Sequence, residues 1–146
     1  MIILSVDYGD IRTGIAVCDK FEMMASPVTV ITQPNRGILI TEITRIAAQK
    51  QAELIIVGLP RNMDGTSGSR AQASAEFAEK LEAAAGIPVK LWDERLTTIA
   101  ANTLLNETGN RGKKRKKIID AVAAAMILQD YIDYKKNTLE HNKPTV

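Results

Sequence analysis

The sequence predicts an α/β protein with a five-stranded mixed sheet and about four helices packed against it. Three strand-like runs open the chain at residues 2–7, 13–19 and 26–31, and the turn-prone residues between them predict an antiparallel meander. Two later strand-like runs, residues 54–57 and 89–92, each follow a helical pattern, as parallel strands do. The predicted sheet therefore combines three antiparallel strands with two parallel ones.

The helices follow from apolar spacing and from signals at their ends. Leu39, Ile43, Ile46 and Ala47 recur at helical spacing, which predicts a helix before the fourth strand. An alanine-rich helix then ends at Gly86, a residue type common just after helices. Two further helices are expected after the last strand, at about residues 97–109 and 118–134.

The chain shows no sign of a second domain. No long linker, internal repeat or low-complexity stretch divides its 146 residues. We therefore expect one domain over about residues 1–136, followed by a polar tail, residues 137–146, that is disordered. The tail holds His141, the only histidine, so a histidine-based triad or metal cluster is not expected.

Composition narrows the class of protein. Hydrophobic residues make up 45% of the chain and charged residues 25%, values typical of a globular domain. Cys18 is the only cysteine, which excludes an internal disulfide and a cysteine zinc cluster. The apolar start lacks a basic leader, and the longest later apolar run, residues 121–128, is too short to cross a bilayer. We expect a cytoplasmic protein without a membrane segment.

Positive charge is concentrated in one segment. Six of the seven residues from Arg111 to Lys117 are lysine or arginine, and without them 13 basic residues face 17 acidic ones, a net charge of −4. A basic loop on an acidic body is a candidate phosphate contact, because each cation near a polyanion releases condensed counterions. A solvated loop that only aids solubility explains the composition equally well.

Three acids stand where an acid is unexpected. Asp7 ends an apolar strand, Glu94 follows the last strand, and Asp120 lies on the apolar stripe of the final helix. Each has an ordinary explanation: a turn contact for Asp7, a solvated strand end for Glu94, and a favourable helix dipole for Asp120. Asp93 and Glu94 point to opposite faces of the sheet, so at most one can share a site with Asp7.

Taken together, the three acids favour a metal site. Two strand ends and the start of a helix can converge in a compact sheet, and converged carboxylates repel one another unless cations separate them. Carboxylate oxygens are the ligands that Mg²⁺ and Mn²⁺ prefer. Two such ions can activate water and stabilise the leaving oxygen of a phosphodiester. This pattern predicts a metal-dependent nuclease.

Four blocks in order along the chain resemble the YqgF family, also called RuvX. They are residues 6–16 (VDYGDIRTGIA), 58–65 (GLPRNMDG), 93–98 (DERLTT) and 120–124 (DAVAA). The resemblance implies an RNase H-like fold similar to RuvC-type Holliday-junction resolvases, and a nuclease that matures the 5′ end of the 16S ribosomal RNA precursor. It also implies catalytic or metal-ligand roles for Asp7, Glu94 and Asp120.

The chain departs from the RuvC pattern at one place. That pattern has an acid near the end of the fourth strand, where this chain has Gly58-Leu59-Pro60. Because this acid is missing, the sequence does not decide whether the site binds one metal ion or two. Asp64 in the following loop is a substitute candidate, although turn chemistry explains it better. Asp64 and Asp93 are the less certain members of the predicted site.

The remaining site residues are basic or polar and are expected to contact phosphates. The predicted set is Arg12, Asn62, Arg70, Arg95, Lys113, Lys114, Arg115, Lys116 and Lys117. Since aromatic residues make up only 4% of the chain, recognition should depend on backbone and shape rather than on base stacking.

The expected partner is nucleic acid, either precursor rRNA or structured DNA, with ribosomal particles as a further partner and a monomer or homodimer as the working unit. Two rival functions stay open. A nucleotide binder is one, because an Asp-x-Gly turn also opens the phosphate-binding lobes of sugar-kinase and actin-like ATPases. A non-catalytic RNA-binding protein of the same fold is the other.

Overall fold

The computed structural model describes residues 1–59, 69–93 and 112–141, with only the backbone path for residues 59, 69, 112–121 and 137–141. Within these ranges, five strands form one sheet with the spatial order β3-β2-β1-β4-β5. The strands are β1 (Ile3–Asp7), β2 (Arg12–Cys18), β3 (Ala25–Thr32), β4 (Leu54–Leu59) and β5 (Val89–Asp93). The helices are α1 (Arg36–Lys50), α2 (Ser69–Ala85) and α4 (Gly112–His141).

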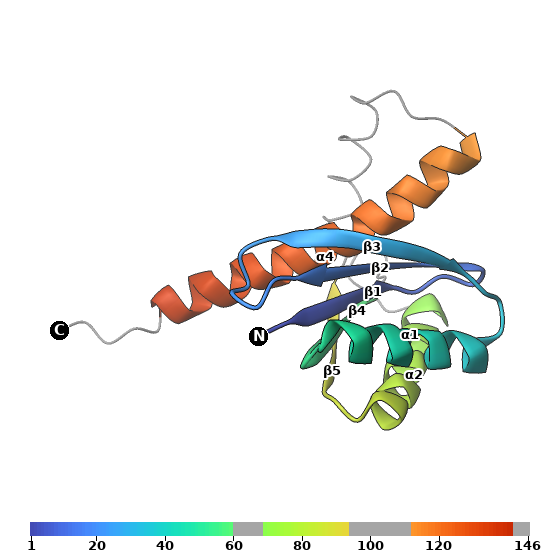
Figure 1. The fold of residues 1–146 in the computed structure, drawn as a ribbon, viewed down its shortest axis with the longest axis horizontal. Helices are drawn as coiled ribbons and strands as arrows, with labels where there is room; N and C mark the ends of the chain where they lie inside the picture. Colours follow the sequence, from blue (N-terminus) through green and yellow to red (C-terminus); the bar gives the residue numbers. More distant parts are fainter. Residues whose placement is uncertain (60–68, 94–111, 142–146) are drawn as a thin grey trace.

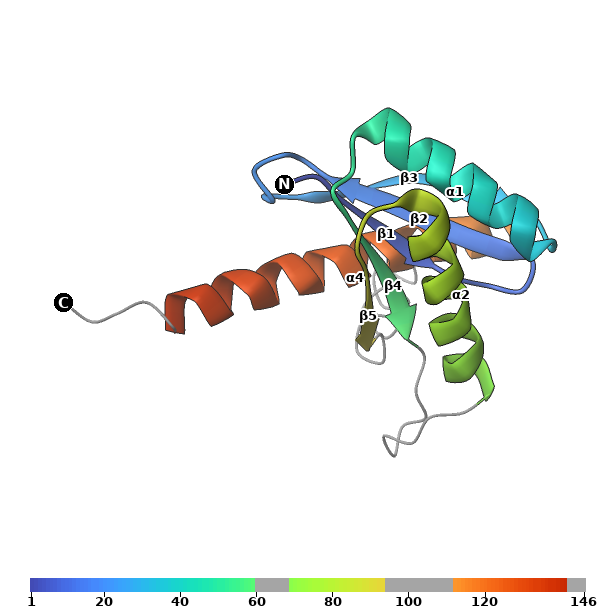
Figure 2. The same ribbon diagram turned by 90° about the horizontal axis from the view of Figure 1, so that it is seen from below.

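The pairing confirms the predicted mixed sheet. β2 pairs antiparallel with both β1 and β3, while β4 pairs parallel with both β1 and β5. The three strands β1, β4 and β5 therefore run the same way, so their carboxyl ends lie at one end of the sheet; Figure 2 shows β4 and β5 side by side.

Helices cover both faces of the sheet. Figures 1 and 2 show α1 and α2 on one face and α4 on the other, with the C-terminal end of α4 extending beyond the sheet. Side chains alternate along β1, so Leu4 and Val6 are buried in the cluster that holds Phe77 of α2. Ile3 instead joins the cluster of Ile127 and Leu128 on α4. β1 is thus buried on both faces.

The ends of the first helix are set by local chemistry. The Asn35 side chain accepts a hydrogen bond of 3.0 Å from the Ile38 amide, which caps the start of α1. Gln51 ends the helix in the left-handed conformation, with φ of 60°. The second helix ends as predicted, with Gly86 at φ of 72° just after it.

Helix α4 differs from the prediction at its start. It begins at Gly112, so residues 112–117 of the basic segment are helical, and the prediction of a basic loop was wrong for them. Lysine and arginine are good helix formers, and no proline interrupts the segment, so the last helix extends back through it. The predicted helix at residues 97–109 lies outside the described residues.

The same helix also runs further than predicted. It continues past Tyr134 to His141, because neither glycine nor proline occurs before Pro144. The predicted domain boundary at residue 136 stays a prediction. In the parts of the chain that the structure describes, no helix is both long and apolar enough to span a membrane.

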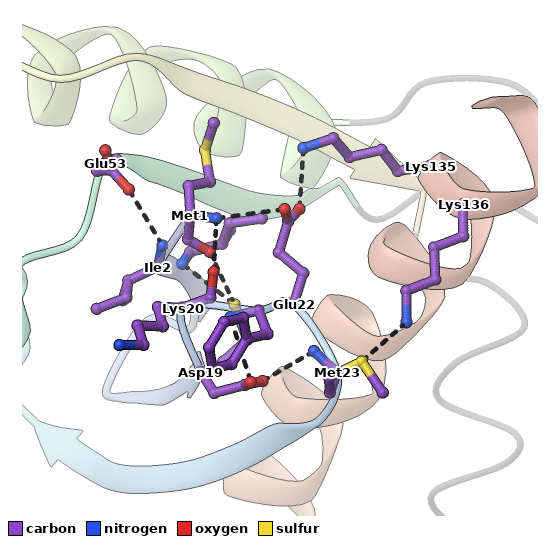
Figure 3. Close-up of polar contacts among 12 residues, drawn as sticks. Met1, Ile2, Asp19, Lys20, Glu22, Met23, Glu53, Lys135 and Lys136 are labelled. Atoms are coloured by element: carbon purple, nitrogen blue, oxygen red, sulfur yellow. Dashed lines mark hydrogen bonds and ion pairs between the residues drawn. The ribbon is translucent and has the colours of Figure 1, made fainter.

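The turn between β2 and β3 is tied to α4. Glu22 accepts a hydrogen bond of 2.9 Å from Lys135 Nζ, while Asp19 accepts hydrogen bonds from the amides of Met23 and Met24 at 2.8 and 3.1 Å (Figure 3). The bond between Glu22 and Lys135 holds the meander against the second half of the helix, and the bonds to Asp19 order the turn itself.

Candidate functional site

Asp7 lies half buried at the carboxyl end of β1, the central strand of the sheet. Ser5, two residues earlier, is fully buried, and its hydroxyl donates a hydrogen bond of 2.6 Å to the Ala124 carbonyl of α4. Because side chains alternate along a strand, Asp7 faces the same way as Ser5, towards α4. The predicted position of Asp7 at a strand end is confirmed.

The path of α4 brings Asp120 towards the same place. In Figures 1 and 2, α4 runs opposite to β1, so the end of β1 lies towards the start of the helix. Ile3 belongs to the cluster of Ile127 and Leu128, Ser5 meets Ala124, and Asp120 lies one helical turn before Ala124. The backbone therefore carries position 120 to the level of Asp7, while the Asp120 side chain lies outside the described set.

The end of β5 distinguishes Asp93 from Glu94. The Trp92 ring packs against Tyr131 and Tyr134 of α4, with centroids 5.6 and 5.2 Å apart, so Trp92 faces α4. Alternation turns Asp93 to the opposite face from Asp7. Glu94 lies outside the described residues.

Two glycines flank Asp7 on the face of α4. Asp7 pairs with Gly14 of β2, and Gly58 of β4 follows Val57, the partner of Val6. Leu54 and Ile56 of β4 belong to the cluster under α4, so alternation sets Gly58 on that face. Asp7 is therefore flanked on this face by glycine positions of β2 and β4.

Arg70 at the start of α2 holds the turn that follows Asp7. Its Nη2 donates to the Tyr8 carbonyl at 2.6 Å, and its Nη1 donates to Asp10 Oδ1 at 2.5 Å. The guanidinium lies 5.4 Å from the Tyr8 ring centre, and that ring stacks on Phe77 with centroids 4.1 Å apart. Sequence reasoning expected Arg70 to contact phosphate and missed these contacts, which no local pattern signals.

The same turn is also held by a contact with β2. The Gly9 amide donates to the buried Thr13 hydroxyl at 3.3 Å. A Cβ on Gly9 would lie 2.0 Å from the Arg12 carbonyl oxygen, so only glycine fits this close approach. Arg12 begins β2 next to the turn, opposite Thr32 of β3.

For the other predicted site residues, the structure describes either nothing or only the backbone, so it shows no contact between their side chains. Asn62, Asp64 and Arg95 lie outside the described residues. The backbone of the first turns of α4 carries Lys113, Lys114, Arg115, Lys116 and Lys117. Among the side chains that the structure describes, no three acids, histidines or cysteines cluster as a metal site. Two of the three predicted acids are outside that set.

Cys18 is not suited to act as a nucleophile. Burial raises the pKa of its thiol, which disfavours the reactive thiolate. Its sulfur accepts a hydrogen bond from the Ile3 amide at 3.3 Å, at the opposite end of β1 from Asp7. The sole cysteine therefore serves the packing under α4.

Comparison with known sequences gives one family. Residues 1–134 match the profile of the RuvX family, described as Holliday junction resolvase. A Halothermothrix orenii protein is 42% identical over 135 residues, covering 92% of this chain and 96% of its own. A Clostridium novyi protein is 41% identical over 133 residues, covering 91% and 98%. Both carry the name "Putative pre-16S rRNA nuclease".

Comparison with solved structures gives the fold. RuvC of T. thermophilus in complex with a Holliday junction substrate superposes with a TM-score of 0.62 at 15% identity, covering 94% of this chain and 97% of RuvC. The yeast mitochondrial Holliday junction resolvase Ydc2 gives a TM-score of 0.58 at 12% identity, covering 96% and 80%. The predicted RNase H-like fold is confirmed.

Proposed function

The chain belongs to the RuvX family, and on that premise we propose that it is a metal-dependent nuclease that hydrolyses a phosphodiester bond near the 5′ end of precursor 16S rRNA. Relatives at 42% and 41% identity carry the name of such a nuclease and align over nearly their whole length. Precursor rRNA as the substrate would bring the protein, as a monomer or a homodimer, to ribosomal particles in the cytoplasm.

One observation carries the chemistry. The half-buried carboxylate of Asp7 ends the central strand on the face of α4, and the hydrogen bond between Ser5 and Ala124 aligns that strand with the helix turn that follows Asp120. An acid without a functional role would more commonly be exposed to solvent than placed on the helix-covered face of a sheet. The backbone arrangement therefore supports Asp7 and Asp120 as partners in one site.

The donor set fits a hard divalent cation. Asp7, Glu94 and Asp120 supply only carboxylate oxygens, which suit Mg²⁺ or Mn²⁺, and Asp7 lies between glycine positions of β2 and β4. When bound, such a cation supplies the charge that makes water nucleophilic and stabilises the leaving oxygen. We propose two ions, held by these three acids.

The start of α4 is the proposed substrate contact. Six of the seven residues at 111–117 are basic, and residues 112–117 form the N-terminal turns of a helix. Cations at a helix N-terminus oppose the helix dipole, whereas a phosphate there is favoured by both the dipole and the basic side chains. The same helix carries Asp120, so phosphate binding and the proposed acid share one rigid element.

A structured DNA substrate is the second candidate. The family description names a Holliday junction resolvase, and a nuclease that leans on backbone and shape can accept either nucleic acid. Four-way junctions therefore belong in the same assay as precursor rRNA.

The test is cleavage of precursor 16S rRNA and of four-way DNA junctions with Mg²⁺ or Mn²⁺. Asp7→Asn and Asp120→Asn should each lower the cleavage rate by about 100-fold or more, because losing even an outer-shell partner of a metal commonly costs 10–100-fold. Chelation with EDTA should abolish cleavage.

Asp133→Asn is the matched control, because Asp133 is an exposed acid on the same helix that accepts a side-chain hydrogen bond of 3.2 Å from Gln129. It should cleave at the wild-type rate. Equal cleavage by wild type, Asp7→Asn and Asp120→Asn would refute the catalytic assignment. Binding of RNA without cleavage of either substrate would leave a non-catalytic RNA-binding protein.

A further inference from the structure

We infer that Arg70 is a positioning residue for the proposed metal site, acting through the backbone that follows Asp7 rather than by contacting substrate phosphate. This inference rests on the proposed function and adds a residue on α2, an element that contributes none of the three proposed acids. It assigns Arg70, Tyr8, Phe77 and Asp10 to one unit, here named the turn clamp.

The clamp acts on the peptide between Tyr8 and Gly9, one residue beyond Asp7. Arg70 Nη2 donates to the Tyr8 carbonyl at 2.6 Å, so the orientation of that peptide plane is set by a side chain on another element. Tyr8 shares its preceding planar peptide bond with Asp7, so fixing the backbone of Tyr8 on one side and its ring on the other limits how the Asp7 backbone can rotate. Holding the Tyr8 carbonyl therefore restricts the directions in which Asp7 can point.

The Tyr8 ring gives the clamp a second hold. It contacts both the Arg70 guanidinium, 5.4 Å from its centre, and the fully buried Phe77 ring, stacked 4.1 Å away with an interplanar angle of 4°. Arg70 and Phe77 are two helical turns apart on α2 and so share one face of that helix. A rigid helix thus grips both the backbone and the side chain of Tyr8.

The ion pair with Asp10 completes the clamp but is its weakest part. Arg70 Nη1 lies 2.5 Å from Asp10 Oδ1, and the Asp10 side chain is 86% exposed. Solvent screens such a pair strongly. The hydrogen bond to Tyr8 and the ring stack should therefore carry more of the effect than Asp10 does.

The hydrogen bonds that the Arg70 guanidinium already makes argue against a role in binding substrate phosphate. Two of its terminal N–H groups already donate to protein oxygens on the same turn, which is the bidentate geometry that guanidinium favours and ammonium cannot reproduce. Arg70→Lys keeps the charge and loses this geometry. The two roles therefore predict different behaviour for the same variant.

The test measures metal binding without substrate, together with steady-state cleavage. Mn²⁺ affinity is read by electron paramagnetic resonance, and deuterium uptake of the peptide covering residues 7–13 is read in the metal-free protein. Arg70→Ala and Arg70→Lys should both weaken Mn²⁺ binding about tenfold or more, speed uptake in the turn, and lower kcat with KM nearly unchanged. Asp10→Ala should act in the same direction and less strongly.

A phosphate contact would give the opposite pattern. Arg70→Ala would raise KM, Arg70→Lys would restore much of it, and Asp10→Ala would lower KM by releasing the guanidinium, all with unchanged Mn²⁺ affinity. That pattern overturns the inference. Arg45→Ala is the control for charge loss, because Arg45 is an exposed arginine on α1; it should change none of these values.

The Asp7→Asn protein separates failure of the inference from failure of the proposed function. If wild type binds Mn²⁺ and Asp7→Asn does not, unchanged affinity in the Arg70 variants overturns the inference alone. If Mn²⁺ binding does not depend on Asp7, the proposed function fails and the inference fails with it.

Discussion

Glu22 links the turn between β2 and β3 to helix α4 through an unusual backbone conformation. Its φ of 55° is left-handed, a region that side chains other than glycine enter rarely. Its carboxylate binds Lys135 at 2.9 Å and the α-amino group of Met1 at 3.3 Å (Figure 3). Partial burial acts to raise the pKa of Glu22, but the hydrogen bonds and charges of these two partners outweigh it and lower the pKa from its ordinary 4.5.

Glu22 should therefore contribute to stability in a pH-dependent way. A carboxyl whose folded pKa is depressed stabilises the fold above the unfolded pKa, near 4.5, and loses that contribution as the pH falls through the folded pKa. We expect Glu22→Gln to lower the free energy of unfolding at pH 7 by up to about 1 kcal/mol, as for a partly exposed ion pair.

Urea unfolding across pH 7 to 3 checks this prediction, and the gap between wild type and Glu22→Gln should close in acid. Glu79→Gln, a change at an exposed residue of α2, should show no such gap. A difference that stays constant down to pH 3 would mean that the charge of Glu22 is not the cause.

At the scale of elements, the contact between β1 and α4 depends on small side chains. Ser5 pairs with Ala16 on β2 and donates to the Ala124 carbonyl at 2.6 Å, and all three residues are fully buried. Small residues allow the helix backbone to approach the sheet closely. The proposed site lies one turn further along the same contact, so the spacing of sheet and helix there sets the spacing of Asp7 and Asp120.

Enlarging Ser5 should separate these two elements. In Ser5→Val, a methyl group would meet the Ala124 carbonyl at less than van der Waals distance, which we expect to cost about 1–3 kcal/mol of unfolding free energy. Ser5→Ala, which only removes a hydrogen bond, should cost about 1 kcal/mol. On the proposed function, cleavage should fall in Ser5→Val and be largely retained in Ser5→Ala.

Denaturant unfolding and the cleavage assay together measure both effects. Ser26→Val, the same change at an exposed position on the edge strand β3, is the control and should alter neither. Wild-type cleavage in a folded Ser5→Val protein would show that the close approach of α4 is not needed for activity.

At the scale of the whole molecule, charge is separated between a basic helix start and an acidic remainder. Outside residues 111–117, the chain has a net charge of −4. A polyanion should therefore be repelled by most of the molecule and attracted to the start of α4. This distribution orients a nucleic acid towards the end of the helix that carries Asp120.

Removing that charge should weaken binding in a salt-dependent way. We expect the quadruple change of Lys113, Lys114, Lys116 and Lys117 to glutamine to reduce the slope of log K against log salt by up to about 0.7 per lost contact on single-stranded RNA. Neutralising Lys20, Lys50, Lys80 and Lys136, four exposed lysines elsewhere, gives the same net charge and should leave the slope nearly unchanged. Equal slopes for both quadruple variants would refute a localised contact.

The sequence by itself determined the strands, two of the helices and the position of Asp7. These features depend on neighbours along the chain: a short, mostly apolar run defines β1, the spacing of Leu39 and Ile43 defines α1, and a glycine ends α2. Sequence pattern also indicated Asp120 as an acid on an apolar helix face, and the structure sets the backbone of that turn against β1. The start of α4 was misjudged, because a run of like charges has no amphipathic pattern even when it is helical.

Only the tertiary structure decided what surrounds Asp7. Arg70 reaches the Tyr8 carbonyl across 62 positions of sequence, and Ser5 reaches Ala124 across 119. Local patterns cannot encode such pairs, because they exist only once the order of strands and the packing of helices on both faces bring distant segments together. For that reason the sequence identified Asp7 as an unusual acid, while the helix that faces it and the clamp that holds its turn emerged only in the folded chain.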